Sequence, residues 1–162
     1  MFSLEGKNAL VTGATGGSGE AIARMLHAQG AAVSLSGTRA EKLEALAAEL
    51  GDRAFVTPAN LSDRDAVDAL LPTAEEKMGS VDILVNNAGI TRDGFFHKMS
   101  VDKWRQVIAA DLDSVFNMSH GVFGGNFLAL LWPCGAQSVG VAHRRHSRRA
   151  RARVTQARVK RT

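Results

Sequence analysis

A glycine-rich segment, set between a strand pattern and a helix pattern, constrains the fold of this chain more than any other feature. The segment runs Thr12-Gly-Ala-Thr-Gly-Gly-Ser-Gly19. It follows an apolar run at residues 8–12, which predicts a buried strand, and it precedes the amphipathic pattern of a helix at residues 20–29. In such a unit the glycines permit a tight turn and a close approach of backbone to phosphate, and the helix N–H groups face the anion. The alternative, a simple turn, does not account for the strand and helix on either side.

Strand and helix patterns keep alternating through the first 119 residues. This order implies parallel strands joined by right-handed crossovers. We therefore predict an α/β fold with a Rossmann-like, doubly wound parallel sheet, whose ligand site lies beyond the carboxyl ends of the strands. Pro72 is expected to kink or end the third helix. The predicted strands cover residues 8–12, 32–36, 54–57 and 81–85, and the predicted helices cover residues 20–29, 41–50, 63–78 and 100–116, the last one capped by Ser100.

The charge of the chain changes abruptly near residue 120. Residues 1–120 contain 16 acidic and 11 basic residues, whereas residues 121–162 contain 9 basic residues and no acidic one. No strand–helix unit is predicted after about Ser119. We therefore divide the chain into a dinucleotide-binding domain at residues 1–119 and an irregular, Arg-rich tail at residues 120–162 that is expected to be disordered. A sheet truncated after its fourth strand would leave that strand as an exposed apolar edge.

The end of the second predicted strand bears on the choice of dinucleotide. An NAD site usually has a carboxylate here that holds the ribose hydroxyls. This chain has Ser36-Gly-Thr-Arg39 instead, with no carboxylate. Because Arg39 can pair with a 2′-phosphate and a carboxylate would repel one, the sequence favours NADP(H) as the cofactor. The alternative interpretation of Arg39 is a solvated side chain near the start of a helix.

A second motif follows the fourth predicted strand. The run Val81-Asp-Ile-Leu-Val-Asn-Asn-Ala-Gly89 combines an apolar strand with small residues against which a cofactor can lie. Together with the glycine-rich segment, it resembles the short-chain dehydrogenase/reductase superfamily. The longer run to Asp93, and the pattern from Trp104 to Phe116, resemble most the bacterial 3-oxoacyl-[acyl-carrier-protein] reductases. The resemblance covers residues 1 to about 119.

The resemblance implies a set of cofactor contacts in this chain. We expect them in the glycine-rich segment, after the second and third strands, and after the fourth strand. Ser18 stands where the family usually has an aliphatic residue. The expected cofactor-binding residues are Gly13, Ala14, Thr15, Gly16, Gly17, Ser18, Gly19, Thr38, Arg39, Asn60, Leu61, Asn87, Ala88 and Gly89.

The family's catalytic residues are not matched. In that family a Tyr–x–x–x–Lys pair protonates the carbonyl oxygen while NADPH delivers hydride, but this chain contains no tyrosine. Asp111 stands at the position of the family's catalytic Asn, and a carboxylate cannot donate a hydrogen bond as an amide can. We therefore expect no intact catalytic residue. The resemblance implies NADPH-dependent reduction of a 3-oxoacyl thioester, and this chain is expected to be inactive in it. A non-enzymatic dinucleotide-binding module is the alternative.

The origin of the tail leaves two interpretations open. It is either a frameshifted translation of a reductase gene or a basic arm for nucleic acid or anionic lipid. Because residues 143–153 contain no aromatic side chain to stack on bases, nucleic acid is the less favoured partner.

The remaining expectations concern partners and location. The resemblance implies an acyl-carrier-protein thioester as partner and homo-oligomers, but the family's assembly surfaces lie largely outside the matched residues, so we do not expect that assembly here. No metal site and no membrane span are predicted, and Cys134 as a lone cysteine fits a reducing compartment. We expect a cytoplasmic protein.

Overall fold

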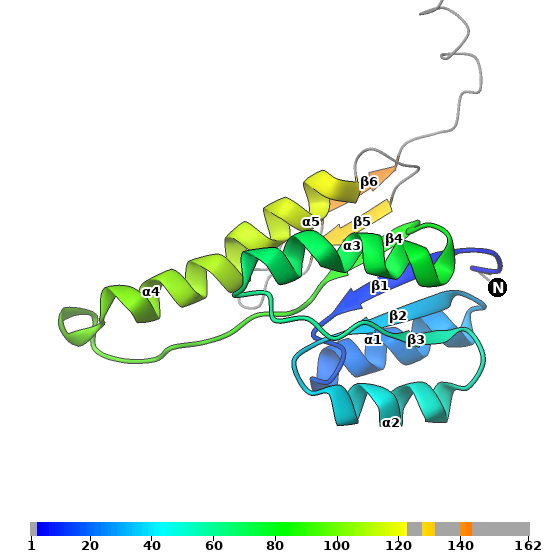
Figure 1. The fold of residues 1–162 in the computed structure, drawn as a ribbon, viewed down its shortest axis with the longest axis horizontal. Helices are drawn as coiled ribbons and strands as arrows, with labels where there is room; N and C mark the ends of the chain where they lie inside the picture. Colours follow the sequence, from blue (N-terminus) through cyan, green and yellow to red (C-terminus); the bar gives the residue numbers. More distant parts are fainter. Residues whose placement is uncertain (1–2, 123–127, 132–139, 144–162) are drawn as a thin grey trace, which may run out of the picture.

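The computed structural model describes residues 3–122, 128–131 and 140–143. Its centre is one sheet with the strand order β3-β2-β1-β4-β5-β6 (Figure 1). The chain crosses from β3 on one side of β1 to β4 on the other, which is the reversal that creates a ligand crevice in a doubly wound sheet. The strands are β1 (Asn8–Thr12), β2 (Ala32–Ser36), β3 (Ala54–Val56), β4 (Ile83–Asn86), β5 (Leu128–Leu131) and β6 (Gly140–His143).

The first four strands confirm the predicted parallel sheet. β1 pairs in parallel with both β2 and β4, and β2 pairs in parallel with β3. β1 and β2 have the predicted bounds. β3 ends one residue early, although the Thr57 N–H still donates to the Leu35 carbonyl at 3.0 Å, and β4 begins at Ile83 rather than at residue 81.

Two stretches of the segment that we expected to be irregular are strands. β5 pairs in parallel with β4, from Ile83 opposite Leu128 to Asn86 opposite Leu131. β6 then pairs antiparallel with β5. The expected exposed edge at β4 is therefore not found, because both sides of β4 are paired. The rest of the tail, and the disorder expected of it, lies outside the described residues.

Helices cover both faces of the sheet and close two apolar layers. α1 (Gly17–Ala28) and α2 (Ala40–Leu50) pack on the face that carries Val11 and Leu35. α3 (Arg64–Met78) and α5 (Ser114–Val122) pack on the opposite face, which carries Leu10 and Leu84. Because successive strand residues point to opposite faces, one short apolar strand supplies both layers. Figure 1 shows the two helix pairs on either side of the strands.

α3 runs through Pro72 as a single helix, so of the two predicted outcomes, a kink or an end, the proline does not end the helix. Pro72 is exposed, and so is Asp68, the residue whose carbonyl the missing N–H would have bonded. The helix start is fixed by Asp63, whose side chain accepts a hydrogen bond from the Asp65 N–H at 3.0 Å.

The predicted helix from Ser100 onward is divided by a π-helical turn. α4 (Val101–Ile108) is capped by Ser100 as predicted, η2 (Ala109–Asp113) is π-helical, and α5 continues from Ser114. The short 3-10 turn η1 (Phe96–Lys98) precedes α4. Several large apolar side chains of this region are exposed rather than buried: Phe95, Phe96, Val101, Trp104, Leu112 and Phe116.

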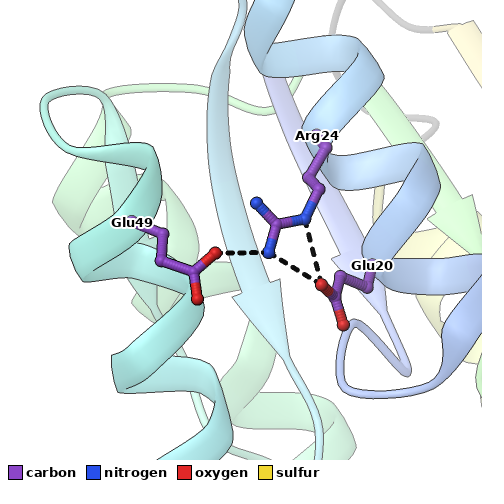
Figure 2. Close-up of polar contacts among 3 residues, drawn as sticks. All are labelled: Glu20, Arg24 and Glu49. Atoms are coloured by element: carbon purple, nitrogen blue, oxygen red, sulfur yellow. Dashed lines mark hydrogen bonds and ion pairs between the residues drawn. The ribbon is translucent and has the colours of Figure 1, made fainter.

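A three-residue ion cluster joins α1 to α2. The Arg24 guanidinium donates to the Glu20 carboxylate through Nε and Nη2 at 3.0 and 2.8 Å, and Nη2 also donates to Glu49 at 2.5 Å (Figure 2). The hydrogen bonds to Glu49 and then Glu20 raise the pKa of Arg24 above its ordinary value. Because that value is already far above neutral pH, Arg24 stays charged at physiological pH. The cluster bridges α1 and α2 outside the ligand site.

None of the helices in the part of the chain that the structure describes is both long and apolar enough to cross a bilayer.

Candidate functional site

A cavity of about 350 Å³ lies at the carboxyl ends of β1, β2 and β4. This is the position that a doubly wound sheet gives to its ligand. The four loops that follow β1, β2, β3 and β4, together with the start of α1, form most of its wall, and Ala110 of the π-helical turn completes it. The described lining residues are Gly13, Thr15, Gly16, Gly17, Ser18, Gly19, Ser36, Gly37, Thr38, Arg39, Ala59, Asn60, Leu61, Ser62, Asn87, Ala88, Gly89, Ile90 and Ala110.

The structure gathers all but one of the sequence-predicted cofactor residues around this cavity. The exception is Ala14. Its side chain is fully buried in the apolar core, and its N–H donates to the Ser36 carbonyl at 2.9 Å. Ala14 thus ties the glycine-rich loop to the end of β2 and lies outside the described wall, and its cofactor contact stays a prediction.

Two glycines of the loop are required by close contacts. Gly13 has a φ of +66°, and a Cβ there would come within 2.8 Å of the Ala88 Cα. A Cβ on Gly19 would overlap the Gly13 carbonyl oxygen and the Asn87 amide. Gly17, by contrast, opens α1, and a Cβ added there would meet no atom of the described residues beyond its own neighbours within 4 Å. The loop is thus packed on its inner side and open on the side that lines the cavity.

Thr12 and Asn87 join the loops that follow β1 and β4. The Thr12 hydroxyl donates to the Val85 carbonyl at 3.1 Å and accepts from the N–H groups of Asn87 and Ala88 at 3.0 and 3.1 Å. The Asn87 amide donates to the carbonyls of Thr12 and Gly13 at 3.0 and 3.2 Å. These three bonds use the one donor and both acceptor positions of the Thr12 hydroxyl. Thr12 opens the glycine-rich motif, but no role was predicted for it.

Arg39 lies against the glycine-rich loop, as its predicted role requires. Its Nη2 donates to the Thr15 carbonyl at 2.6 Å, and its Nε and Nη2 donate to the Thr15 hydroxyl at 3.2 and 3.0 Å. Both residues line the cavity. Arg39 is the one charged side chain in the described part of the cavity wall, and its presence makes that wall favourable to an anion.

Ser36 is a site residue that sequence reasoning missed. It is the last residue of β2 and lines the cavity, and its buried hydroxyl has no hydrogen-bond partner among the described residues. A buried polar atom of this kind is usually satisfied by water or a ligand. Ser36 lies two residues before the predicted Thr38–Arg39 pair. That position is the signal by which the sequence could have identified it as a site residue. The other lining residues that were not predicted are Gly37, Ala59, Ser62, Ile90 and Ala110.

Asp111 lies in the π-helical turn beside the cavity, next to the lining residue Ala110. Its carboxylate accepts a hydrogen bond from the Ile90 N–H at 2.8 Å. This hydrogen bond needs only an acceptor at position 111, and a carboxylate oxygen provides one. Asp111 thereby connects the π-helical turn to the loop after β4.

The cavity contains few groups that could transfer a proton. Within the described ranges its wall has hydroxyls, amides, backbone groups and one guanidinium, and it has no Asp, Glu, His, Lys, Cys or Tyr. The same described residues form no cluster of three potential metal ligands. This wall is suited to binding and orienting a polar ligand and offers no general acid near neutral pH.

Comparison with known proteins places these features in a family. A family model described as short chain dehydrogenase matches residues 7–125. Nodulation protein G of Rhizobium sp. (strain N33) is 62% identical over 119 residues, covering 74% of this chain and 49% of that protein. The 3-oxoacyl-[acyl-carrier-protein] reductase FabG of Vibrio harveyi is 41% identical over 124 residues, covering 76% and 51%.

A solved structure agrees with these relatives. The 3-ketoacyl-(acyl-carrier-protein) reductase from Brucella melitensis, complexed with NADH, has a TM-score of 0.72 and 34% identity, covering 76% of this chain and 51% of that one. The chain thus spans about half the length of the curated relatives it matches.

Proposed function

The chain belongs to the short-chain dehydrogenase family, and on that premise we propose that it binds a nicotinamide adenine dinucleotide, with NADP(H) preferred over NAD(H). One observation carries the proposal: the glycine-rich loop is packed tightly against Asn87 and Ala88 on its inner side and is open toward the cavity at Gly17. A simple turn needs no such division between a closed and an open side.

The residues present fit the dinucleotide. Gly16 and Gly17 at the start of α1 would hold the pyrophosphate through backbone N–H groups. The Ser36 hydroxyl is a buried polar atom without a described partner at the same cavity. Asn60, Leu61, Ala88 and Gly89 are further predicted contacts, and all four line the wall.

The preference for NADP(H) rests on Arg39. No carboxylate lies at the end of β2 to hold the ribose hydroxyls of NAD(H), and Arg39 brings a positive charge to that end of the cavity. A charge-assisted hydrogen bond between a guanidinium and a 2′-phosphate contributes roughly 1.5–3 kcal/mol. We therefore expect the chain to bind NADP(H) more tightly than NAD(H).

The bound cofactor supplies a hydride in its reduced form. The reductase relatives support a 3-oxoacyl thioester, carried by acyl carrier protein, as the substrate class of this lineage. Nodulation protein G states no substrate in its name, so this class rests on the reductases alone. We also propose a cytoplasmic location, in keeping with a soluble carrier substrate.

We propose that the 162-residue chain binds cofactor without completing this reduction by the family's route. The sequence contains no tyrosine, and the described cavity wall offers no other acid of suitable pKa. Loss of proton transfer by a positioned group costs typically 10²–10⁴ in rate. Asp111 serves as an acceptor for the Ile90 N–H, which is a structural contact between the π-helical turn and the loop after β4.

A single methyl group tests the proposed binding site. Gly17→Ala adds a Cβ that no protein atom opposes, so the fold is expected to stay intact while dinucleotide approach is blocked. We expect NADPH affinity, measured by nicotinamide fluorescence, to fall about tenfold or more. Gly94→Ala is the matched control, because it also places a Cβ in open space and lies outside the cavity wall. Equal NADPH affinity in both variants would show that no dinucleotide lies on this loop.

A further inference from the structure

Arg39 is held at the cavity by a residue 24 positions earlier in the chain. Its Nε and Nη2 donate to the hydroxyl of Thr15, and Nη2 also donates to the Thr15 carbonyl at 2.6 Å. Arg39 is exposed, whereas Thr15 is half-buried in the glycine-rich loop. An exposed arginine samples many rotamers when nothing holds it. The contacts with Thr15 are therefore what fixes the guanidinium beside the cavity.

These contacts leave part of the guanidinium for a ligand. Arginine has five N–H donors, and the bonds to Thr15 engage the Nε and Nη2 side. Nη1 donates to no residue in the described part of the chain. Two donors and the full charge thus remain for an anion. The Thr15 hydroxyl accepts from Arg39 and keeps its own proton for donation.

Resting on the proposed function, we infer that Thr15 is the positioning residue for cofactor discrimination. It holds the Arg39 guanidinium ready for the 2′-phosphate that distinguishes NADP(H) from NAD(H). Because Arg39 is the one charged side chain in the described cavity wall, discrimination depends on where this guanidinium is held. A side chain that is fixed before binding loses less conformational entropy when it contacts the ligand. Only NADP(H) carries the 2′-phosphate that Arg39 would contact, so fixing Arg39 raises the affinity for NADP(H) and not that for NAD(H).

The test compares NADPH and NADH affinity in the full chain and four variants. Thr15→Val keeps the shape and the carbonyl and removes the hydroxyl, Thr15→Ser keeps the hydroxyl, and Arg39→Met removes the cation. The fourth variant combines Thr15→Val with Arg39→Met. Thr73→Val is the matched control, because its hydroxyl donates to the Ala69 carbonyl on α3, outside the cavity.

Thr15→Val is expected to weaken NADPH about five- to tenfold more than it weakens NADH, so the ratio of the two affinities carries the test. Circular dichroism of the variant and of the parent checks that both fold. Thr15→Ser is expected to restore most of the preference. In the Arg39→Met background the Thr15 substitution is expected to change nothing further, because Thr15 acts through Arg39.

Four results would overturn the inference. Equal weakening of NADPH and NADH by Thr15→Val would show a contact common to both cofactors, and a further NADPH loss in the Arg39→Met background would show a direct phosphate contact. A Thr15→Val variant that keeps the preference would overturn the positioning role while the proposed function stands. If the parent chain binds neither cofactor, the proposed function and this inference fail together.

Discussion

At the residue scale, the Thr12 hydroxyl is the point on which the site's geometry depends. It is buried and makes three hydrogen bonds, which hold the loop after β4 against the end of β1. The Asn87 amide adds two more bonds across the same junction. The small residues that follow Asn87 are therefore held against the glycine-rich loop by polar contacts rather than by apolar packing.

We predict that Thr12→Val destabilises the chain by about 1–3 kcal/mol. The substitution keeps the volume, but it leaves the half-buried Ala88 N–H without its described partner, and an unsatisfied donor that is shielded from water costs up to that amount. Urea unfolding of the two proteins measures the difference. Thr91→Val, at an exposed threonine, is the control and is expected to stay within about 0.5 kcal/mol of the parent. Equal midpoints for Thr12→Val and the control would contradict this role for the hydroxyl.

Sequence reasoning at this scale recovered the motif residues and missed how they are arranged. Glycines at fixed spacing indicated the loop because their conformational freedom is a local property. The inward direction of Ala14 and the bonds between Thr15 and Arg39 depend on how β1 and β2 align, and no local pattern carries that information.

At the element scale, the strands next to the glycine-rich segment were the most predictable. β1 and β2 have their predicted bounds because short apolar runs end there at glycine-rich or polar residues. The segment from α4 to α5 was predicted as one helix, since an apolar repeat cannot distinguish a continuous α-helix from one with a π-helical turn. β5 was missed because its run of apolar residues is short and no helical pattern follows it.

α3 offers a test of how a helix accommodates a proline. We predict that Pro72→Ala stabilises the chain by about 1 kcal/mol. Alanine restores the hydrogen bond to the Asp68 carbonyl and favours the helix. The greater entropy of the unfolded chain offsets part of this gain. Thermal unfolding followed by circular dichroism measures the change. A lower melting temperature for Pro72→Ala would show that the proline is needed for the path of α3.

At the scale of the whole molecule, the site joins parts of the chain that lie far apart in sequence. The cavity wall takes residues from the ends of β1, β2 and β4, from the loop after β3 and from the π-helical turn. Two apolar layers, one on each face of the sheet, hold these parts in place. A ligand that contacts all of them should stabilise the fold as a unit.

We therefore predict that NADPH raises the melting temperature of the chain. At a concentration one hundred times the dissociation constant, a ligand that binds only the folded state adds about 2.7 kcal/mol to the free energy of unfolding. Differential scanning fluorimetry with NADPH, NADH and no cofactor measures the shift, and Gly17→Ala serves as the binding-deficient control. A melting temperature that is independent of both cofactors would contradict a folded dinucleotide site.

We propose that this chain keeps a dinucleotide site without a tyrosine to protonate a substrate. The most direct test adds the purified chain to NADPH, follows nicotinamide fluorescence, and then adds acetoacetyl thioester in the same cuvette. We predict enhanced NADPH fluorescence on binding and no oxidation after the thioester is added. Oxidation of NADPH at a rate that the thioester controls would contradict the claim, because a group other than tyrosine would then be supplying the proton.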